Sequence, residues 1–209
     1  MNATSPRTFP VPARLAIFGS GAGSNARAII EWAIDKKNDA PFDVVLIVST
    51  SSNAGINDVA RTYGIPLIVV ERSLPLEDQT DMLQQALHEH GVTIIALAGY
   101  LRKIEPVIIR LVNGHILNIH PSLLPAYGGQ GMYGARVHEA VLAAGETQTG
   151  VTIHLVTAAY DDGAILAQHR VLIREADTVA DLTDRVRRAE HTLYPSVIAG
   201  YVRSVAVGS

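Results

Sequence analysis

The sequence alternates short apolar segments with amphipathic segments of helical period over most of its length. One segment, residues 43–49, is apolar almost throughout, which is typical of a strand buried on both faces. Strands that alternate with helices in this way form βαβ units. We therefore expect an α/β fold, with a Rossmann-like, open, twisted and mostly parallel sheet of about seven strands flanked by helices.

The expected elements follow from this alternation. The predicted strands cover residues 14–18, 43–49, 66–70, 93–98, 114–118, 151–156 and 164–171. The predicted helices cover residues 25–37, 56–63, 76–89, 103–112 and 135–144, and a closing helix begins near residue 179 after a cap at Asp177 or Thr178. Residues 1–13 contain three prolines, so we expect a flexible lead-in before a single domain over residues 14–209.

Composition excludes several classes of protein. A net charge of −3 is unlike a nucleic-acid binder, and no apolar run reaches the roughly 18 residues of a membrane span. The absence of cysteine excludes disulfides, zinc–thiolate sites and a cysteine nucleophile. The eight histidines lack the spacing of metal ligands, so we expect no metal site. With no signal peptide in view, we expect a cytoplasmic enzyme that acts on small molecules, its oligomeric state left open.

A glycine-rich turn, residues 19–25, follows the first predicted strand. Backbone N–H groups at the start of a helix bind phosphate in many α/β folds. The dinucleotide-binding motif G-x-G-x-x-G occurs only as its variant with alanine at the last position, from Gly21 to Ala26. The second predicted strand also ends without the carboxylate that binds a ribose in dinucleotide sites. The turn therefore favours phosphate over a dinucleotide. Alternatively, its glycines only allow a tight turn and close packing of helix on strand.

An Asn-x-His sequence ends the fifth predicted strand. Side chains alternate along a strand, so Asn118 and His120 lie on one face, at the carboxyl end where open sheets bind ligands. Histidine exchanges protons near neutral pH, and an asparagine amide can donate to an oxyanion. Asp161 is the candidate carboxylate partner. Spacing alone does not bring Asp161 to His120, and Asp162-Gly163 also reads as a simple turn.

From about residue 14 to residue 201 the chain resembles the glycinamide ribonucleotide formyltransferases of purine synthesis. The sequence Asn-Ile-His-Pro-Ser-Leu-Leu-Pro at residues 118–125 is specific to folate-dependent formyltransferases as a group. The glycine-rich turn and the pair Glu190-His191 point to this family within the group. The other matching segments are residues 98–102, residues 151–154, Asp161 with Gly163, and Tyr194-Pro195.

The resemblance implies transfer of a formyl group from the co-substrate 10-formyltetrahydrofolate to the primary amine of glycinamide ribonucleotide, by direct attack and without a metal. It implies that Asn118 donates to the tetrahedral oxyanion, that His120 acts as an imidazolium, and that Asp161 raises the pKa of His120 and relays protons. It further implies ribonucleotide binding by Gly21, Ala22, Gly23, Ser24, Asn25 and Glu190. The folate-binding residues that it implies are Leu101, Arg102, Ile104, Asn118, Thr157 and Asp161.

The sequence departs from the family pattern at two places. The loop of residues 127–134 is longer than the usual Pro-Gly loop, and the histidine usually found there has His138 as its candidate counterpart. An arginine that assists phosphate binding near the third helix is unmatched, and Arg187 is its candidate replacement. His154 could support the site or be a satisfied core histidine. Leu101 and Ile104 could likewise be ordinary core residues.

Three other functions are alternatives to this interpretation. Formyltetrahydrofolate hydrolase shares the Asn-His-Asp set but normally has an N-terminal regulatory domain, for which thirteen leading residues leave no room. Methionyl-tRNA formyltransferase normally has a C-terminal RNA-binding domain, whereas this chain ends soon after the closing helix. A non-catalytic nucleotide-binding module is the alternative from another class, and intact Asn118, His120 and Asp161 argue against it.

Overall fold

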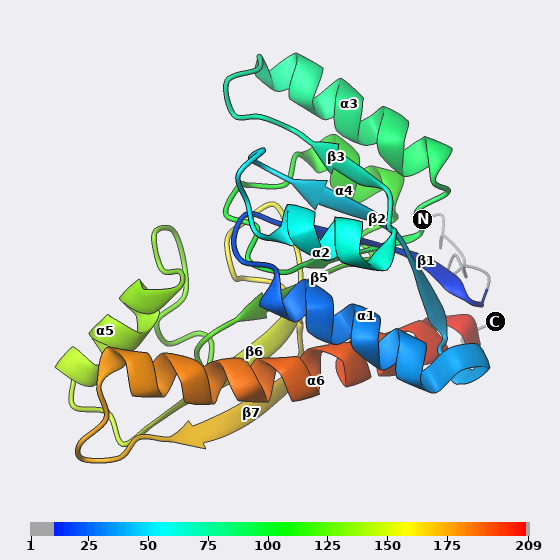
Figure 1. Cartoon of the computed structure of the whole chain (residues 1–209). Coiled ribbons are helices and arrows are strands. Elements are labelled where there is room, and N and C mark those ends of the chain that lie inside the picture. Colours follow the sequence, from blue (N-terminus) through cyan, green and yellow to red (C-terminus); the bar gives the residue numbers. More distant parts are fainter. Residues whose placement is uncertain (1–10, 208–209) are drawn as a thin grey trace, which may run out of the picture.

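The computed structural model describes residues 11–207 and shows a seven-stranded sheet with helices on both faces (Figure 1). The strand order is β3-β2-β1-β4-β5-β6-β7. The first five strands run parallel, β6 is antiparallel to β5, and β7 is antiparallel to β6. The expected α/β fold with a mostly parallel sheet is therefore confirmed.

The bounds of the elements are close to those expected from the sequence. The strands are β1 (Ala13–Gly19), β2 (Phe42–Ser49), β3 (Leu67–Val69), β4 (Ile94–Leu97), β5 (Ile116–His120), β6 (Gln148–Leu155) and β7 (Ile165–Leu172). The helices are α1 (Ser24–Lys36), α2 (Ile56–Tyr63), α3 (Leu76–Glu89), α4 (Pro106–Leu111), α5 (Ala135–Ala143) and α6 (Val179–Val207), with a short 3-10 helix, η1 (Lys37–Asp39), after α1.

Four elements begin or end at residues other than those expected. β5 continues to His120 because residues 117–120 pair with residues 152–155 of β6. β6 starts at Gln148 because its first residues pair with the end of β7. α4 begins only at Pro106, a residue suited to the first helical position, where its missing N–H costs no hydrogen bond. β1 begins at Ala13, inside the expected lead-in, of which residues 1–10 lie outside the described residues.

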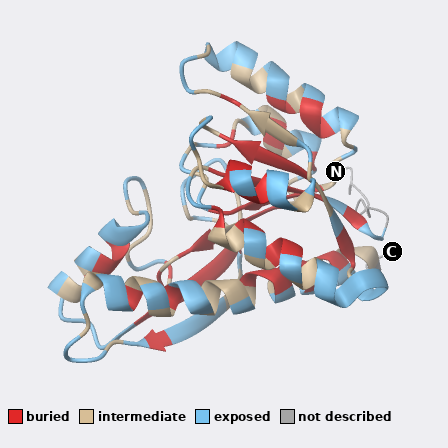
Figure 2. Cartoon of the chain, viewed as in Figure 1, coloured by how far each residue is buried: buried red, intermediate tan, exposed pale blue. Residues whose placement is uncertain are grey.

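Side chains of the central strands alternate between two cores. Leu15 and Ile17 pack with residues of α1, α2, α5 and α6, whereas Ala16 and Phe18 pack with residues of α3 and α4. Figure 2 shows the buried residues along the strands and on the helix surfaces turned toward them, while most of β7, at the edge of the sheet, is exposed. The sheet thus separates two helical layers, and its central strands are buried on both faces.

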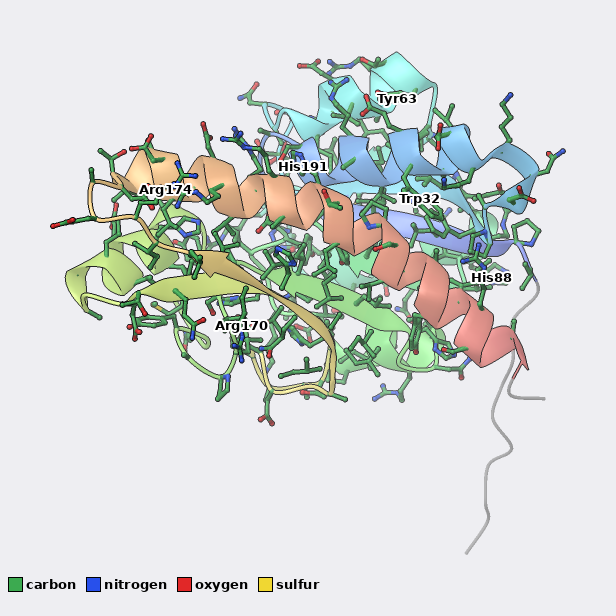
Figure 3. All side chains as sticks on the ribbon, turned by 90° about the horizontal axis from the view of Figure 1, so that it is seen from below. Trp32, Tyr63, His88, Arg170, Arg174 and His191 are labelled. Carbon is green, nitrogen blue, oxygen red and sulfur yellow. The ribbon has the colours of Figure 1, made fainter. Side chains whose placement is uncertain are left out.

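The closing helix α6 lies beside α1 along one face of the sheet, where Trp32 and His191 are labelled in Figure 3. Its start is capped by Thr178, because Asp181 N donates to Thr178 Oγ1 and Thr178 N donates to Asp181 Oδ2. Asp177, the other expected cap, pairs with Arg185 instead, and this pairing lowers its pKa to about 2. Among the described residues, no helix combines the length and the apolar character needed to cross a membrane.

Candidate active site

A cavity of about 530 Å³ opens beside the carboxyl ends of the central strands. The chain runs outward from β1 through β2 and β3 and resumes at β4 on the other side of β1. Open α/β sheets bind ligands at such a switch point. The cavity wall includes most of the candidate residues: Asn25, Leu101, Arg102, Ile104, Asn118, His120, Thr157, Asp161 and Glu190.

Strand pairing sets the floor of the site. Leu117 and Ile119 pack in the core that includes α6. Asn118 and His120 alternate with them along β5 and so point to the opposite face, as expected from the sequence. In the antiparallel pair of β5 with β6, Asn118 lies opposite His154. Directly opposed residues of two strands have their side chains on the same face. His154 therefore lies on the same face as Asn118 and His120, in a register that no local sequence pattern predicts.

Asp161 reaches the two β5 side chains from the connection between β6 and β7. Its Oδ2 lies 3.6 Å from His120 Nδ1, and its Oδ1 lies 3.5 Å from both His154 Nε2 and Asn118 Nδ2. Gly129 N donates to Oδ2 at 2.8 Å. The fold thus brings together Asn118, His120 and Asp161, a contact that sequence spacing alone did not predict.

Burial and nearby donors act in opposite directions on Asp161. Burial raises its pKa, but the contacts with His154, with Gly129 N–H and with His120 together outweigh burial and leave the pKa below the usual value. Asp161 is consequently a carboxylate at neutral pH. Its negative charge lies at the centre of the cluster, where it can accept hydrogen bonds or protons.

The charge of His120 differs from the expectation. Burial lowers its pKa most, Asp161 and the carbonyl of Tyr127 raise it, and the net result lies below the usual value. Asp161 therefore acts in the expected direction, but burial outweighs it, so the free protein favours a neutral imidazole over the expected imidazolium. The Nε2 atom lies 2.8 Å from Tyr127 O and carries the proton, because a carbonyl oxygen can only accept.

Two further histidines lie at the site. His154 is 2% exposed, but it is more than a core histidine, since its Nε2 lies 3.1 Å from Asn118 Nδ2. His138, on α5, lines the cavity, and its pKa is lowered by burial and by His120. Its buried Nδ1 has no hydrogen-bond partner within residues 11–207. The longer loop therefore still leads to a histidine at the cavity.

The glycine-rich turn meets a steric requirement. Gly23 has a φ of 78°, and a Cβ there would lie 2.8 Å from Ile56 Cα on α2, so this glycine allows the turn to approach α2 closely. Asn25 lines the cavity, whereas Gly21, Ala22, Gly23 and Ser24 are not among its lining residues. No side chain caps the start of α1, so its first N–H groups remain available to an anion. Phosphate binding by the turn stays a prediction.

Asn25 connects this turn to α6. Its Nδ2 donates to Glu190 Oε2 at 2.8 Å, and burial raises the pKa of Glu190 although Asn25 and Arg187 oppose the rise. Arg187 also lines the cavity, with its guanidinium 2.6 Å from Asp184 Oδ1. That Arg187 assists phosphate binding in place of the unmatched arginine remains a prediction.

The candidate folate residues line the opposite part of the wall. Leu101 is 52% exposed and so is not a core residue, whereas Ile104 is 5% exposed and packs with α4 as well as lining the cavity. The guanidinium of Arg102 donates to Gln79 Oε1 and to Thr50 O. Because these contacts occupy its side chain, main-chain groups of this segment remain for a ligand. Within residues 11–207, no cluster of three potential protein ligands for a metal occurs.

Comparison with known proteins agrees with this geometry. The sequence profile of the family described as formyl transferase matches residues 13–198. The chain belongs to the formyl transferase family.

Several relatives of this formyl transferase are named phosphoribosylglycinamide formyltransferase. Chloroplastic phosphoribosylglycinamide formyltransferase of Arabidopsis thaliana is 42% identical over 190 residues, covering 88% of this chain and 64% of the relative. The relative of that name from Vigna unguiculata is 43% identical over 187 residues, which cover 88% of this chain and 59% of the relative. The chain thus spans less than two thirds of these curated relatives. A solved phosphoribosylglycinamide formyltransferase from Brucella melitensis is 38% identical, with a TM-score of 0.82 over 91% of this chain and 95% of its own.

A second solved structure separates fold from activity in this formyl transferase. A formyltetrahydrofolate deformylase from Pseudomonas syringae has a TM-score of 0.80 but only 19% identity, covering 96% of this chain and 63% of its own. This likeness shows the fold alone. The reaction therefore depends on the amide, imidazole and carboxylate groups of the site and not on the fold.

Proposed function

We propose that the chain transfers the formyl group of 10-formyltetrahydrofolate to the primary amine of glycinamide ribonucleotide in de novo purine (IMP) biosynthesis. The observation that carries the proposal is the contact of Asn118, His120 and Asp161 on the wall of one cavity. The names of the relatives, at 38–43% identity, support phosphoribosylglycinamide, another name for glycinamide ribonucleotide, as the formyl acceptor.

The ribonucleotide occupies the part of the cavity beside α1 and α6 in this proposal. Its phosphate meets the uncapped N–H groups of residues 21–25, where the helix dipole favours an anion. Glu190 accepts hydrogen bonds from the ribose hydroxyls, and Asn25 keeps its carboxylate in place. The folate lies against Leu101, Arg102, Ile104 and Thr157, close to Asp161 and Asn118.

The reaction is a direct displacement. The amine nitrogen bonds to the formyl carbon, and the carbonyl electrons move to oxygen as a tetrahedral oxyanion. When this collapses, the bond to the folate N10 breaks and N10 gains a proton. A neutral His120 is suited to take up the amine proton, directly or through Asp161 and water, and to return it as an imidazolium. The amide of Asn118 stabilises the oxyanion.

The decisive assay incubates the protein with 10-formyltetrahydrofolate, with and without glycinamide ribonucleotide. We expect formyl transfer only when the amine is present. Release of formate without the amine would instead indicate a hydrolase. No turnover of the formyl donor in either mixture would indicate a nucleotide-binding module.

Variants connect that assay to the site. Asn118→Ala and His120→Ala should each lower kcat about 10²–10⁴-fold, because each removes a group that acts on the reacting atoms. His169→Asn, on the exposed strand β7, is the control and should keep normal turnover. Near-normal turnover of the Asn118 variant would contradict the assignment.

A further inference from the structure

The neighbouring backbone sets the protonation of His154. The imidazole is buried on β6, and its Nδ1 lies 2.8 Å from Leu155 O. A carbonyl oxygen can only accept a hydrogen bond, so Nδ1 carries the proton. In neutral His154 the other nitrogen, Nε2, therefore presents a lone pair toward β5.

This lone pair faces the amide of Asn118. The Nδ2 atom of Asn118 lies 3.1 Å from His154 Nε2 and 3.5 Å from Asp161 Oδ1. Both of those atoms are acceptors when His154 is neutral, and Nδ2 has two hydrogens to donate. The reversed amide would place Asn118 Oδ1 against a lone pair and a carboxylate, with no donor among the three, which is unfavourable in a buried site.

The opposite end of the amide is free for a ligand. Asn118 lines the cavity, and its Oδ1 has no hydrogen-bond partner in the part of the chain that the structure describes. With Nδ2 engaged by His154 and Asp161, Oδ1 is the amide atom turned toward the cavity. The resting site therefore offers a hydrogen-bond acceptor where oxyanion stabilisation requires a donor.

We infer that His154 is a positioning residue that controls which end of the Asn118 amide faces the reacting centre. The inference rests on the proposed function. With neutral His154, Asn118 Oδ1 accepts a hydrogen from the attacking amine and aims the nitrogen lone pair at the formyl carbon. When the oxyanion forms, the Asn118 amide rotates, and Nδ2 exchanges its hydrogen bond to His154 for one to the oxyanion. The charged or titratable groups that face His154 in this exchange are Asp161 and His120.

The protonation of His154 can be measured without substrate. Protein labelled with ¹⁵N-histidine gives long-range ¹H–¹⁵N spectra that distinguish the two neutral imidazole forms, and a His154→Gln sample assigns the signal. We expect the form with the proton on Nδ1. The form with the proton on Nε2 in the free protein would overturn the inference.

A pair of variants tests the positioning role during turnover. His154→Leu removes the acceptor, whereas the amide oxygen of His154→Gln can still accept from Asn118 Nδ2. We expect His154→Leu to lower kcat about 10–100-fold, less than loss of a direct oxyanion donor, with KM for the ribonucleotide changed less than about threefold. His154→Gln should recover most of kcat. Equal kcat in the two folded variants, or a change in KM alone, would overturn the inference.

A control on the same strand accounts for general damage to β6. Thr149 is buried there, and its hydroxyl has no partner among the described residues, so Thr149→Val should keep the wild-type kcat. A loss in Thr149→Val equal to that in His154→Leu would also count against a specific role. Absence of formyl transfer in the wild-type protein would refute the proposed function, whereas a wrong imidazole form refutes only the role of His154.

Discussion

At the scale of single residues, the chemistry of the site depends on the charge of Asp161. Asp161→Asn removes the negative charge that raises the pKa of His120, so that pKa should fall further below its usual value. Because proton transfer loses its carboxylate, kcat should fall about 10²–10⁴-fold. An NMR titration of the His120 ring and steady-state kinetics measure the two effects.

The exposed neighbour provides the control. Asp162→Asn removes the same charge next to Asp161 in the chain, but residue 162 is exposed, so the His120 pKa and kcat should stay close to wild type. An unchanged His120 pKa in Asp161→Asn would contradict the geometry of the pair.

Sequence reasoning reached some of these residues and not others. Alternation along one strand was enough to place Asn118 and His120 on one face. The position of Asp161 depends on how the β6–β7 connection folds back over β5, and that of His154 depends on the register of an antiparallel pair. Both are long-range properties, so spacing could not predict them; the sequence offered Asp161 only as a candidate, and the family resemblance supported it.

At the scale of elements, the β6–β7 connection positions Asp161 through a close backbone approach at Gly163. A Cβ at Gly163 would lie 1.7 Å from Leu155 O, so Gly163→Ala must displace the connection. Because Asp161 is two residues away, kcat should fall at least about tenfold, and overpacking should cost about 1–3 kcal/mol in the free energy of unfolding. Kinetics and urea denaturation measure these changes.

Gly200 in α6 provides the matched control for that substitution. A Cβ there meets nothing within 4 Å, so Gly200→Ala should raise the free energy of unfolding by about 0.5–1 kcal/mol and leave kcat unchanged. Normal kcat in Gly163→Ala would show that the connection tolerates the shift.

The position of α6 depends on one buried hydroxyl. Tyr194 OH lies 3.0 Å from Leu97 O and 2.9 Å from Leu117 O, and so connects α6 to β4 and β5. Tyr194→Phe should lower the free energy of unfolding by about 1–2 kcal/mol, since two buried carbonyls lose the one hydroxyl hydrogen that they share. Tyr63→Phe removes an exposed hydroxyl and should cost less than about 0.5 kcal/mol. Equal losses in urea denaturation would contradict this account.

The predicted bounds of helices α2 and α3 are the same as those in the structure. The apolar run of β2 predicted its bounds almost to the residue. β5 and β6 differ more, because their ends depend on cross-strand pairing rather than on local hydrophobicity. Likewise, the sequence predicted helix α4 too early because the start of that helix depends on Pro106.

At the scale of the whole molecule, burial of histidines at the cavity connects function to stability. Burial lowers the pKa values of His120 and His138, so both are neutral in the folded protein at a pH where the unfolded chain already binds protons. The usual pKa of about 6.5 marks the start of this difference. Below it the unfolded state binds more protons than the folded state, so stability falls as pH decreases toward the folded pKa values.

We therefore expect the free energy of unfolding to be constant above about pH 6.5 and to decrease between about pH 6.5 and about pH 5, before most carboxylates titrate. Urea denaturation at a series of pH values measures the slope. Burial also lowers the pKa of His191, so three histidines contribute to the slope. His138→Gln removes one of them and should make the slope shallower, whereas His88→Asn, on the exposed face of α3, should leave it unchanged. Asp161, whose pKa is lowered, adds its own loss of stability only at more acidic pH, below about 4. Stability that stayed level down to about pH 5 would contradict the lowered pKa values of these histidines.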